Sequence, residues 1–365
     1  MTSSLKQSIF AYARSLGFSL VGITTAEPFP EGDAALTAWL DDGCAGDMEY
    51  MKRAPSARSH PRELLPGARS IIALAMSYYS DDRVTTGPSN YSNTSNYRTE
   101  QRQFRGPSSA LSLLGPDSSP HGRIAPFPVD EGSGTTRPVT HGRVARYAWG
   151  KDYHRVMRKR LESLVRYIES LAPEAKCRIT VDTSPLLERA TAQRAGLGFV
   201  GKNTMLVTRG FGSWVFLASV VTTLDLPADP PDRRSCGLCR ICIDSCPAQA
   251  ITAPYRLDAR RCTAYWTIES REPVPEPLKG KTGNWIFGCD ACQEACPHNK
   301  RAASTNVPEF NPSRGAGARL PLREVLALKT DEEFKKRFGG TPLARLGRER
   351  LIRNARQAAL NFGFR

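Results

Sequence analysis

Long apolar runs are absent from this sequence of 365 residues. No stretch approaches the roughly 18 to 20 consecutive apolar residues that a membrane helix needs, and the first residues have the pattern of an amphipathic helix, not of a cleavable leader. A Walker loop is missing, as is any G-x-G-x-x-G turn after a predicted strand, so nucleotide cofactors lack support. We therefore expect a cytoplasmic protein without membrane contact, and we take it to be a monomer.

Histidine is scarce, with five residues, whereas cysteine is concentrated in one region. Eight of the ten cysteines fall within residues 236–296. Residues 236–247 read C-x2-C-x2-C-x3-C-P, residues 289–297 read C-x2-C-x3-C-P, and Cys262 stands between them. The first spacing is the bacterial ferredoxin run, in which the fourth cysteine ligates the other cluster. Eight thiolates are the number that two [4Fe-4S] clusters require.

The crossing rule divides these cysteines into two sets. The first cysteine set is Cys236, Cys239, Cys242 and Cys296, and the second cysteine set is Cys246, Cys262, Cys289 and Cys292. Structural zinc is the main alternative, because four-cysteine zinc sites also use C-x2-C pairs. Zinc, however, does not require three cysteines at successive three-residue steps followed by proline. Cys44 and Cys177 are interpreted as packed or incidental thiols.

The formal net charge is +15, and basic residues gather toward the C-terminus. From residue 301 onward there are fourteen Lys or Arg and six Asp or Glu, so this segment carries +8 of the total. A basic surface is often simply a solvated one. This asymmetry nevertheless favours a polyanionic partner, and nucleic acid is the main candidate.

The chain is predicted to have three parts. Helix and strand patterns alternate over residues 1–228, which predicts an α/β (α+β) domain built around a sheet. Its strands are expected at 18–24, 70–79 and 212–223, and its longest helix within 142–172. Residues 229–311 hold the cysteines and form a ferredoxin-like module, and residues 312–365 read as a short, basic, HEAT-like cap of amphipathic helices.

Residues 80–140 interrupt the first part. They are rich in Ser, Gly, Pro, Asn and Arg and show little periodicity. A stretch of this length and composition is either a flexible surface insertion or a partner-contacting loop, and the composition favours the insertion.

Asp182 is the strongest candidate for acid–base chemistry. It ends a predicted strand just before Pro185, and ligands meet strand ends in open α/β folds. Burial in an apolar pocket would raise its pKa and let it act as a general acid. The same Asp-Thr-Ser-Pro run also predicts a helix N-cap, and from these residues alone the cap is the favoured interpretation.

Two other motifs carry weaker signals. Asp152-Tyr153-His154 begins like the D-x-H-x-x-G box that supplies an axial histidine in some cobalamin enzymes, but Met157 stands where that box has glycine. We therefore interpret His154 as a hydrogen-bonded structural histidine, not as a cobalt ligand. GLGFVGKNT at 196–204 offers glycines for a close backbone approach and Lys202 for an anion.

In combination, these motifs make the chain resemble the epoxyqueuosine reductase family. The resemblance runs in order along nearly the whole chain outside the 80–140 interruption. The matching segments are RSHPRELLPGARSIIALAMSYY (58–79), GRVARYAWGKDYH (142–154), VDTSPLLERATAQRAGLGFVGKNTMLV (181–207), CGLCRICIDSCPAQAI (236–251), DARRCTAYWTIE (258–269), GCDACQEACPHN (288–299) and LIRNARQAALNFG (351–363).

The resemblance implies a cofactor, a reaction and a substrate. Family members bind cobalamin between the α/β domain and the ferredoxin-like module without an axial histidine, and they use electrons from a cluster to reduce the epoxide of epoxyqueuosine at the tRNA wobble position. This is the last step of queuosine formation. Asp182 would then be the proton donor, which reverses the preference for an N-cap. The implied cobalamin contacts are Arg58, Ala145, Asp182, Asn203, Thr267, Ile268, Glu269 and Asp290.

The implied partners are the tRNA anticodon stem-loop, whose phosphates the basic C-terminal helices would contact, and an unidentified electron donor. Three alternatives stay open at this point. They are a corrinoid-dependent reductive dehalogenase, a non-catalytic electron-transfer subunit, and a zinc-stabilised nucleic-acid binder.

Overall fold

The structure is a computed structural model, and it describes residues 2–53, 55–81 and 140–363. The predicted insertion at 80–140 lies outside the described residues, apart from its two ends. Within the described ranges, every helix is too short or too polar to cross a membrane.

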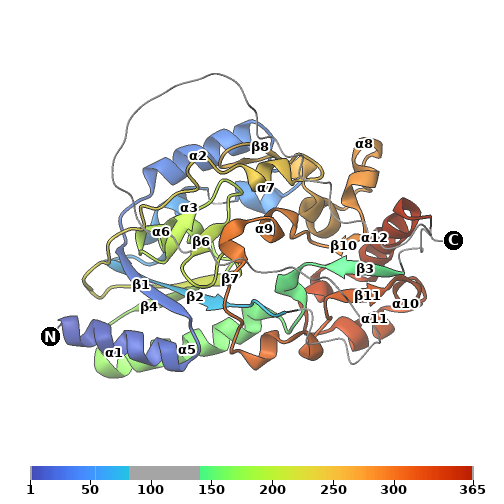
Figure 1. Cartoon of the computed structure of the whole chain (residues 1–365). Helices are drawn as coiled ribbons and strands as arrows, with labels where there is room; N and C mark the ends of the chain where they lie inside the picture. Colours follow the sequence, from blue (N-terminus) through green and yellow to red (C-terminus); the bar gives the residue numbers. More distant parts are fainter. Residues whose placement is uncertain (1, 54, 82–139, 364–365) are drawn as a thin grey trace, which may run out of the picture. The chain divides into compact units, whose positions relative to one another are not determined.

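A four-stranded sheet forms the centre of the first predicted part (Figure 1). Its strands, in spatial order, are β1 (Leu20–Thr25), β2 (Ser70–Ser77), β7 (Val215–Thr222) and β4 (Cys177–Thr180). The predicted strands at 18–24, 70–79 and 212–223 are confirmed as β1, β2 and β7. All eight residues of β2 are buried, because helices cover both faces of the sheet.

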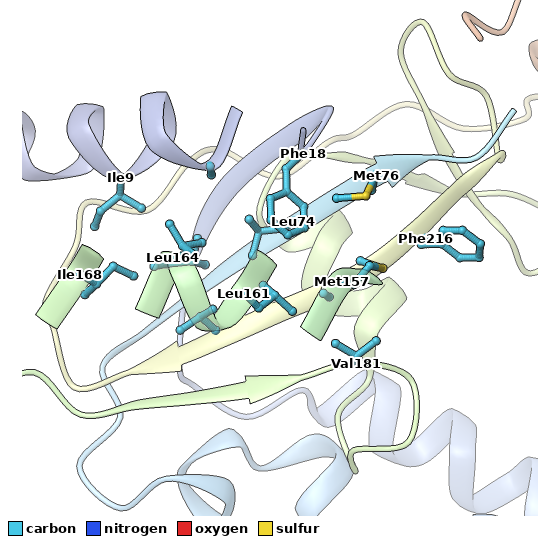
Figure 2. Close-up of a cluster of buried hydrophobic side chains, with 14 of the residues drawn as sticks. Ile9, Phe18, Leu74, Met76, Met157, Leu161, Leu164, Ile168, Val181 and Phe216 are labelled. Atoms are coloured by element: carbon cyan, nitrogen blue, oxygen red, sulfur yellow. The ribbon is translucent and has the colours of Figure 1, made fainter. Parts of the chain in front are cut away.

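Helices α1 (Thr2–Ser15) and α5 (Tyr153–Leu171) cover one face of this sheet (Figure 1). Helix α5 lies within the predicted range and begins after Asp152, whose carboxylate accepts a hydrogen bond from the backbone N–H of His154. Every third or fourth side chain of α5 points inward, as an amphipathic helix requires. Figure 2 shows these side chains against those of the sheet; the labelled core residues are Ile9, Phe18, Leu74, Met76, Met157, Leu161, Leu164, Ile168, Val181 and Phe216.

The opposite face is covered by a second group of helices. These are α3 (Pro55–Ser59), α4 (Pro61–Leu64) and α6 (Glu188–Arg194), and α2 (Pro30–Asp41) packs against α3. Because side chains alternate along a strand, Ile72 and Leu74 of β2 pack toward α5, whereas Ile71 and Ala73 pack toward this second group.

All three pairings in this sheet are antiparallel, so the fold of this part is α+β. The rule that ligands bind at the carboxyl ends of parallel strands therefore does not explain the position of Asp182. Asp182 instead follows β4, an edge strand, and its backbone turns away from the sheet directly after that strand.

The cysteine region contains short elements only. They are hairpin β8 (Ile251–Ala253) and β9 (Arg256–Leu257), helices α7 (Ile241–Asp244), α8 (Glu276–Lys279) and α9 (Ala291–Glu294), and a π-helical turn at Tyr265–Glu269. A separate hairpin, β5 (Gly198–Val200) and β6 (Leu206–Thr208), contributes the loop that contacts this region.

A second sheet joins segments of all three predicted parts. Strand β3 (His141–Val144) pairs in parallel with β10 (Trp285–Phe287) and antiparallel with β11 (Arg319–Pro321). The C-terminal helices α10 (Leu322–Leu326), α11 (Asp331–Phe338) and α12 (Arg348–Asn361) follow, with a 3₁₀ turn at Pro342–Arg345. The other 3₁₀ turns are Glu49–Lys52, Arg146–Ala148, Ala259–Arg261, Gly280–Thr282, Pro297–Asn299, Pro308–Phe310 and Pro312–Arg314.

One predicted helix is in fact two. The amphipathic pattern over 323–338 predicts a continuous helix, but the chain breaks between α10 and α11. Thr330 causes the break, because its hydroxyl caps the new helix by accepting a hydrogen bond from the N–H of Glu333 at 3.2 Å. The hydroxyl of a capping threonine accepts from a backbone N–H that, in a continuous helix, would donate to a backbone carbonyl.

Candidate functional site

The first cysteine set surrounds one cavity. Its four members line this cavity together with Asn203, Val207, Pro297 and His298. Burial, together with the neighbouring thiols of Cys236, Cys296 and Cys239, raises the pKa of Cys242 to about 11. Cys296 lines the same cavity, although it follows the other three cysteines by 54 or more positions in the sequence.

The second cysteine set also gathers in one place. Burial raises the pKa of Cys292, and the thiols of Cys262 and Cys246 raise it further. Burial likewise raises the pKa of Cys289, with added contributions from Cys262 and Cys292. The four thiols are therefore near enough to one another to interact electrostatically.

Backbone N–H groups point at several of these sulfurs. The N–H of Lys202 donates to Sγ of Cys236 at 3.4 Å, and that of Ala250 donates to Sγ of Cys246 at 3.2 Å. Cys262, Cys289 and Cys296 also accept backbone hydrogen bonds. Donors around cysteine sulfur favour thiolates and are a feature of iron–sulfur sites. Cys44 is buried, and its backbone carbonyl accepts a hydrogen bond from the N–H of Ala259 at 2.9 Å. Cys177 donates to the Thr222 hydroxyl at 3.5 Å.

Lys202 and Asn203 lie between the cysteines and the first part of the chain. Nζ of Lys202, which the sequence suggested for an anion, instead donates to the carbonyls of Gly237 and Cys239 at 2.6 and 2.9 Å. Asn203 is 5% exposed, lines the cavity of the first cysteine set, and donates from Nδ2 to the carbonyl of Cys292 at 3.5 Å. It therefore contacts both sets.

Ala145 and Thr267 meet at Gly288. The N–H of Gly288 donates to Oγ1 of Thr267 at 3.0 Å, and a side chain added at Gly288 would lie 2.5 Å from Cβ of Ala145. The φ of Gly288 is +70°, so this contact depends on glycine. Ile268 is buried beside it, in the π-helical turn, a form that is frequent at functional sites.

Asp290 completes this group of predicted cofactor contacts. It is 3% exposed, and burial raises the pKa of its carboxyl to about 7. Oδ2 accepts a hydrogen bond from the N–H of Arg146 at 2.6 Å, and Oδ1 accepts one from Gln293 at 3.4 Å. Both carboxylate oxygens of Asp290 thus have protein partners.

Asp182 does not cap a helix. Helix α6 begins at Glu188 with Leu187 in the cap position, and within the described residues no side chain caps it. The backbone of Asp182 has φ +49°, an uncommon left-handed conformation for a residue with a side chain. Its N–H donates to Oε1 of Glu188 at 2.8 Å, which holds that conformation. The N-cap interpretation is wrong for this residue.

The carboxylate of Asp182 instead bonds to His154. Oδ2 lies 3.0 Å from Nε2 of His154, and Nδ1 of the same ring lies 2.8 Å from Oδ1 of Asp152. Burial lowers the pKa of His154, but the hydrogen bonds to the two carboxylates outweigh it and raise the pKa to about 9. His154 is therefore hydrogen-bonded, as predicted, and protonated at neutral pH.

The pKa of Asp182 differs from the prediction. Burial raises it, but the hydrogen bond and charge of His154 and the hydroxyl of Tyr153 outweigh burial, and the pKa lies below its ordinary value. The expected neutral carboxyl is thus an anion paired with an imidazolium. The side chain of Asp182 remains 43% exposed, so it is open to a ligand.

Sequence reasoning missed several residues around Asp182. Arg345 forms a two-pronged ion pair with Glu269, with both contacts at 2.6 Å. The positive charge of Arg345 lowers the pKa values of Asp182, Tyr50 and Tyr147. The Arg345–Glu269 pair therefore lies near Asp182. Tyr153 lies inside the Asp152-Tyr153-His154 motif, but nothing in a single sequence connects Arg345 to Glu269, 76 positions away.

Arg58 borders the same region. Its Nη2 donates to the carbonyl of Tyr50 at 2.9 Å, and its carbonyl accepts from the N–H of Leu187, five residues after Asp182. Nε of Arg58 is buried and has no hydrogen-bond partner in the described part of the chain. Burial lowers the pKa of this guanidinium.

Two arginines of α12 are not available to phosphates. Arg353 donates to the carbonyls of Trp266, Ser270, Arg271 and Glu272 at 2.7–3.3 Å, and Arg350 donates to that of Ile268 at 3.0 Å. Asn354 donates to the carbonyls of Thr267 and Ile286 at 2.8 and 2.9 Å. These side chains fix the π-helical turn, so the expectation of phosphate contact is wrong for Arg350 and Arg353.

Comparison with known proteins gives consistent matches. Residues 235–299 match the family described as "4Fe-4S double cluster binding domain", and residues 126–183 match "Epoxyqueuosine reductase QueG, DUF1730". The epoxyqueuosine reductase of Xanthomonas campestris is 39% identical over 94% of this chain and 82% of its own length. That of Synechocystis is 36% identical over 92% of this chain and 98% of its own length.

A solved structure agrees with these matches. An epoxyqueuosine reductase crystallised with a tRNA-Tyr epoxyqueuosine-modified stem loop superimposes with a TM-score of 0.79 at 30% identity, covering 99% of this chain and 82% of that one. Identity at this level extends over most of both chains and includes the cysteine region. The chain therefore belongs to the epoxyqueuosine reductase family.

Proposed function

We propose that this protein reduces the epoxide of epoxyqueuosine in the tRNA anticodon loop to the alkene of queuosine, in the cytoplasm. The observation that carries the proposal is the protonated His154–Asp182 pair, which lies open to a ligand and near Glu269 of the cysteine region. Membership of the family and a relative solved with a modified tRNA stem loop support the substrate.

The reaction needs protons as well as electrons. Both carbon–oxygen bonds of the epoxide break, a carbon–carbon double bond forms, and two electrons and two protons convert the oxygen to water. His154 would pass its proton to the Asp182 carboxylate across their 3.0 Å contact, and Asp182 would donate this proton to the departing oxygen. Glu188, whose pKa burial raises to about 8, holds the backbone of Asp182 in place by accepting its N–H.

The residues present fit a cobalamin. Arg58 offers a buried N–H without a partner in the described residues, which suits an amide or phosphate oxygen of the cofactor. Ala145, Asn203, Thr267, Ile268, Glu269 and Asp290 are the other residues that would hold it. When bound, the cobalamin and the two clusters supply the electrons for the reduction.

The two cysteine sets fit [4Fe-4S] clusters. Each set gathers in one place, the first around a cavity, and backbone donors face the sulfurs. Oγ1 of Thr263, next to Cys262, is buried without a partner in the described residues, as expected for a donor that faces cluster sulfur. Because Cys289 flanks Gly288 and Asp290, the second cysteine set would lie nearer the cobalamin.

Anaerobic reconstitution tests the proposal. The protein is loaded with iron, sulfide and cobalamin, and its iron, zinc and cobalt contents are measured. An anticodon stem-loop RNA carrying epoxyqueuosine is then added with reduced methyl viologen, and the nucleosides are analysed by mass spectrometry. We expect two clusters, one cobalamin and conversion to queuosine. Protein that holds zinc in place of iron, or that leaves the epoxide intact with both cofactors bound, would contradict the proposal.

A further inference from the structure

Leu238 stands out among the large apolar side chains of the described residues, because 99% of its surface is exposed. It lies in the loop between Cys236 and Cys239, two members of the first cysteine set. A single exposed leucine is ordinary on a protein surface. Leu238 differs from an ordinary surface leucine because it lies between two expected cluster ligands.

The loop that carries Leu238 is firmly held. Lys202 donates from Nζ to the carbonyls of Gly237 and Cys239, on either side of Leu238, at 2.6 and 2.9 Å. Tyr255, which is 50% exposed, donates its N–H to the carbonyl of Lys202 at 3.1 Å. The loop therefore presents Leu238 to solvent from a fixed backbone, and Lys202 links this loop to the backbone of Tyr255.

The residues that flank Cys236 and Cys239 differ in exposure from those that flank Cys289 and Cys292. Around Cys236 and Cys239, the neighbours Ser235, Gly237, Leu238 and Arg240 are all exposed. Around Cys289 and Cys292, the neighbours Gly288, Asp290, Ala291 and Gln293 are all buried. Cys242 and Cys296 are buried, so an external protein would approach the first cysteine set through the exposed Cys236–Cys239 loop.

Positive charge surrounds this approach. Arg209, Arg233 and Arg234 line an open groove with Pro230, Pro231 and Asp232, and the chain runs from this groove directly into the Leu238 loop. Arg240 follows the loop, with 67% of its side chain exposed. Asp232 pairs with Arg234, and Asp244 pairs with Arg240 at 3.6 Å, so the four arginines and two aspartates leave this stretch with a net positive charge. An acidic partner surface would be attracted here.

We propose that Leu238, Tyr255, Arg209, Arg233 and Arg240, termed the Leu238 surface, are the docking site for an acidic one-electron carrier protein. The inference rests on the proposed function, which needs electrons from outside. In each transfer the reduced carrier loses one electron and the oxidised cluster of the first cysteine set gains it. Two transfers supply one epoxide reduction. RNA is the alternative occupant, but a phosphate backbone gains nothing from an aliphatic side chain or from proximity to a cluster.

A reduced acidic [2Fe-2S] ferredoxin is the probe for this surface. Its affinity for the cluster-loaded protein is measured by biolayer interferometry, and electron transfer to the clusters is followed by stopped-flow absorbance without RNA. The variants are Leu238→Glu and the double variant Arg233→Glu/Arg240→Glu. The matched controls are Leu360→Glu, at a leucine that is 73% exposed on α12, and Arg158→Glu on the exposed side of α5. Iron content is measured for every protein.

Both test variants should bind the ferredoxin at least about tenfold more weakly, and the second-order rate of cluster reduction should fall by a similar factor. Higher salt should weaken wild-type binding, while the two controls should match the wild type. Turnover with reduced methyl viologen should not change, because this small reductant needs no docking surface. The charge-reversal variant leaves the Leu238 loop intact, so it tests the surface even if Leu238→Glu loses iron.

The inference is overturned if both variants bind and accept electrons like the wild type with iron retained. It is also overturned if the controls lose as much, or if the variants lose affinity for the anticodon stem-loop RNA and not for the ferredoxin. A wild-type protein that takes electrons from the ferredoxin but leaves the epoxide intact contradicts the proposed function and supports the docking site.

Discussion

Nε2 of His154 lies 3.0 Å from Oδ2 of Asp182, and the other nitrogen of the ring lies 2.8 Å from Asp152. One imidazole thus bridges a carboxylate at the start of α5 and another just after β4. Histidine can donate from both nitrogens only when it is protonated, and its pKa of about 9 makes this the form present at neutral pH. The proton for the departing oxygen is therefore stored one hydrogen bond behind Asp182.

The pH dependence of the reaction follows from this pair. The pKa of His154 is raised from 6.5 to about 9, so its proton is bound at neutral pH and is lost as the pH rises through 9. Single-turnover rates of epoxide reduction should therefore be constant up to roughly pH 8 and fall above pH 9. A wild-type rate that stays flat to pH 10 would exclude His154 as the proton store.

The His154–Asp182 pair should also stabilise the fold, and this contribution, like the reaction rate, should fall as the pH rises. A group whose pKa is raised by folding stabilises the fold fully below its unfolded value of about 6.5. This contribution declines above that pH and is lost as the pH reaches about 9. Urea unfolding of the wild type and of His154→Gln should therefore differ more at pH 6 than at pH 9.5. An equal difference at both values would show that His154 contributes through packing alone.

Replacement of His154 should slow the reaction more than replacement of Asp152. We expect His154→Gln to lower the single-turnover rate by about 10²-fold, the usual loss when a proton-transfer group is removed. Asp152→Asn keeps the ring and its contact to Asp182, so it should lose less than about tenfold. Cobalamin uptake, followed by absorbance, should be unchanged in both. Equal losses in the two variants would indicate a structural role for the pair.

Cysteine replacements test the division into two sets. Cys236→Ser and Cys296→Ser should remove the same cluster, although 60 positions separate them, because both line one cavity. Cys292→Ser should remove the other cluster. Iron analysis and electron paramagnetic resonance should show half the iron and the same remaining signal for the first two variants. Cys177→Ser is the control and should keep all of the iron; different remaining signals in Cys236→Ser and Cys296→Ser would refute the pairing.

Asn354 should be important for stability. It is 3% exposed, and its amide donates to the carbonyls of Thr267 and Ile286. Asn354→Ala leaves both buried carbonyls unpaired and should lower the free energy of unfolding by about 2–4 kcal/mol. Cobalamin affinity should also fall, because the π-helical turn is expected to contact the cofactor.

Arg356 provides the control for Asn354. It lies two residues further along α12 and is exposed, so Arg356→Ala should change the free energy of unfolding by less than about 0.5 kcal/mol. Denaturant titrations of the two variants make the comparison. The loss expected for Asn354→Ala is about 2–4 kcal/mol, because two buried carbonyls lose their partner. A loss below about 1 kcal/mol would show that the turn does not depend on this side chain.

The parts of the site that the sequence could predict depend on local spacing. Cys236, Cys239 and Cys242 stand three residues apart, and only a few metal sites need that spacing. The strand at 70–79 was also predictable, because its apolar run is longer than any exposed strand would tolerate. In both cases neighbouring residues carry the information.

The rest depends on contacts between distant segments. The ion pair of Arg345 and Glu269 joins residues 76 positions apart, and no local sequence pattern predicts it. From the sequence alone, Arg353 is indistinguishable from the other basic residues of its helix. Only the fold shows that it donates to the backbone carbonyls of the π-helical turn and of the residues that follow it. The anionic state of Asp182 likewise depends on His154, 28 positions earlier, and so could not be derived from its own surroundings.

The Asp182→Asn variant tests the central claim most directly. It is loaded anaerobically with both clusters and cobalamin, mixed with epoxyqueuosine-containing anticodon stem-loop RNA and reduced methyl viologen, and sampled by mass spectrometry over a single turnover. We predict that the variant binds cobalamin and RNA like the wild type and forms no queuosine while the wild type converts its substrate. Queuosine formation by Asp182→Asn at the wild-type rate would contradict the account.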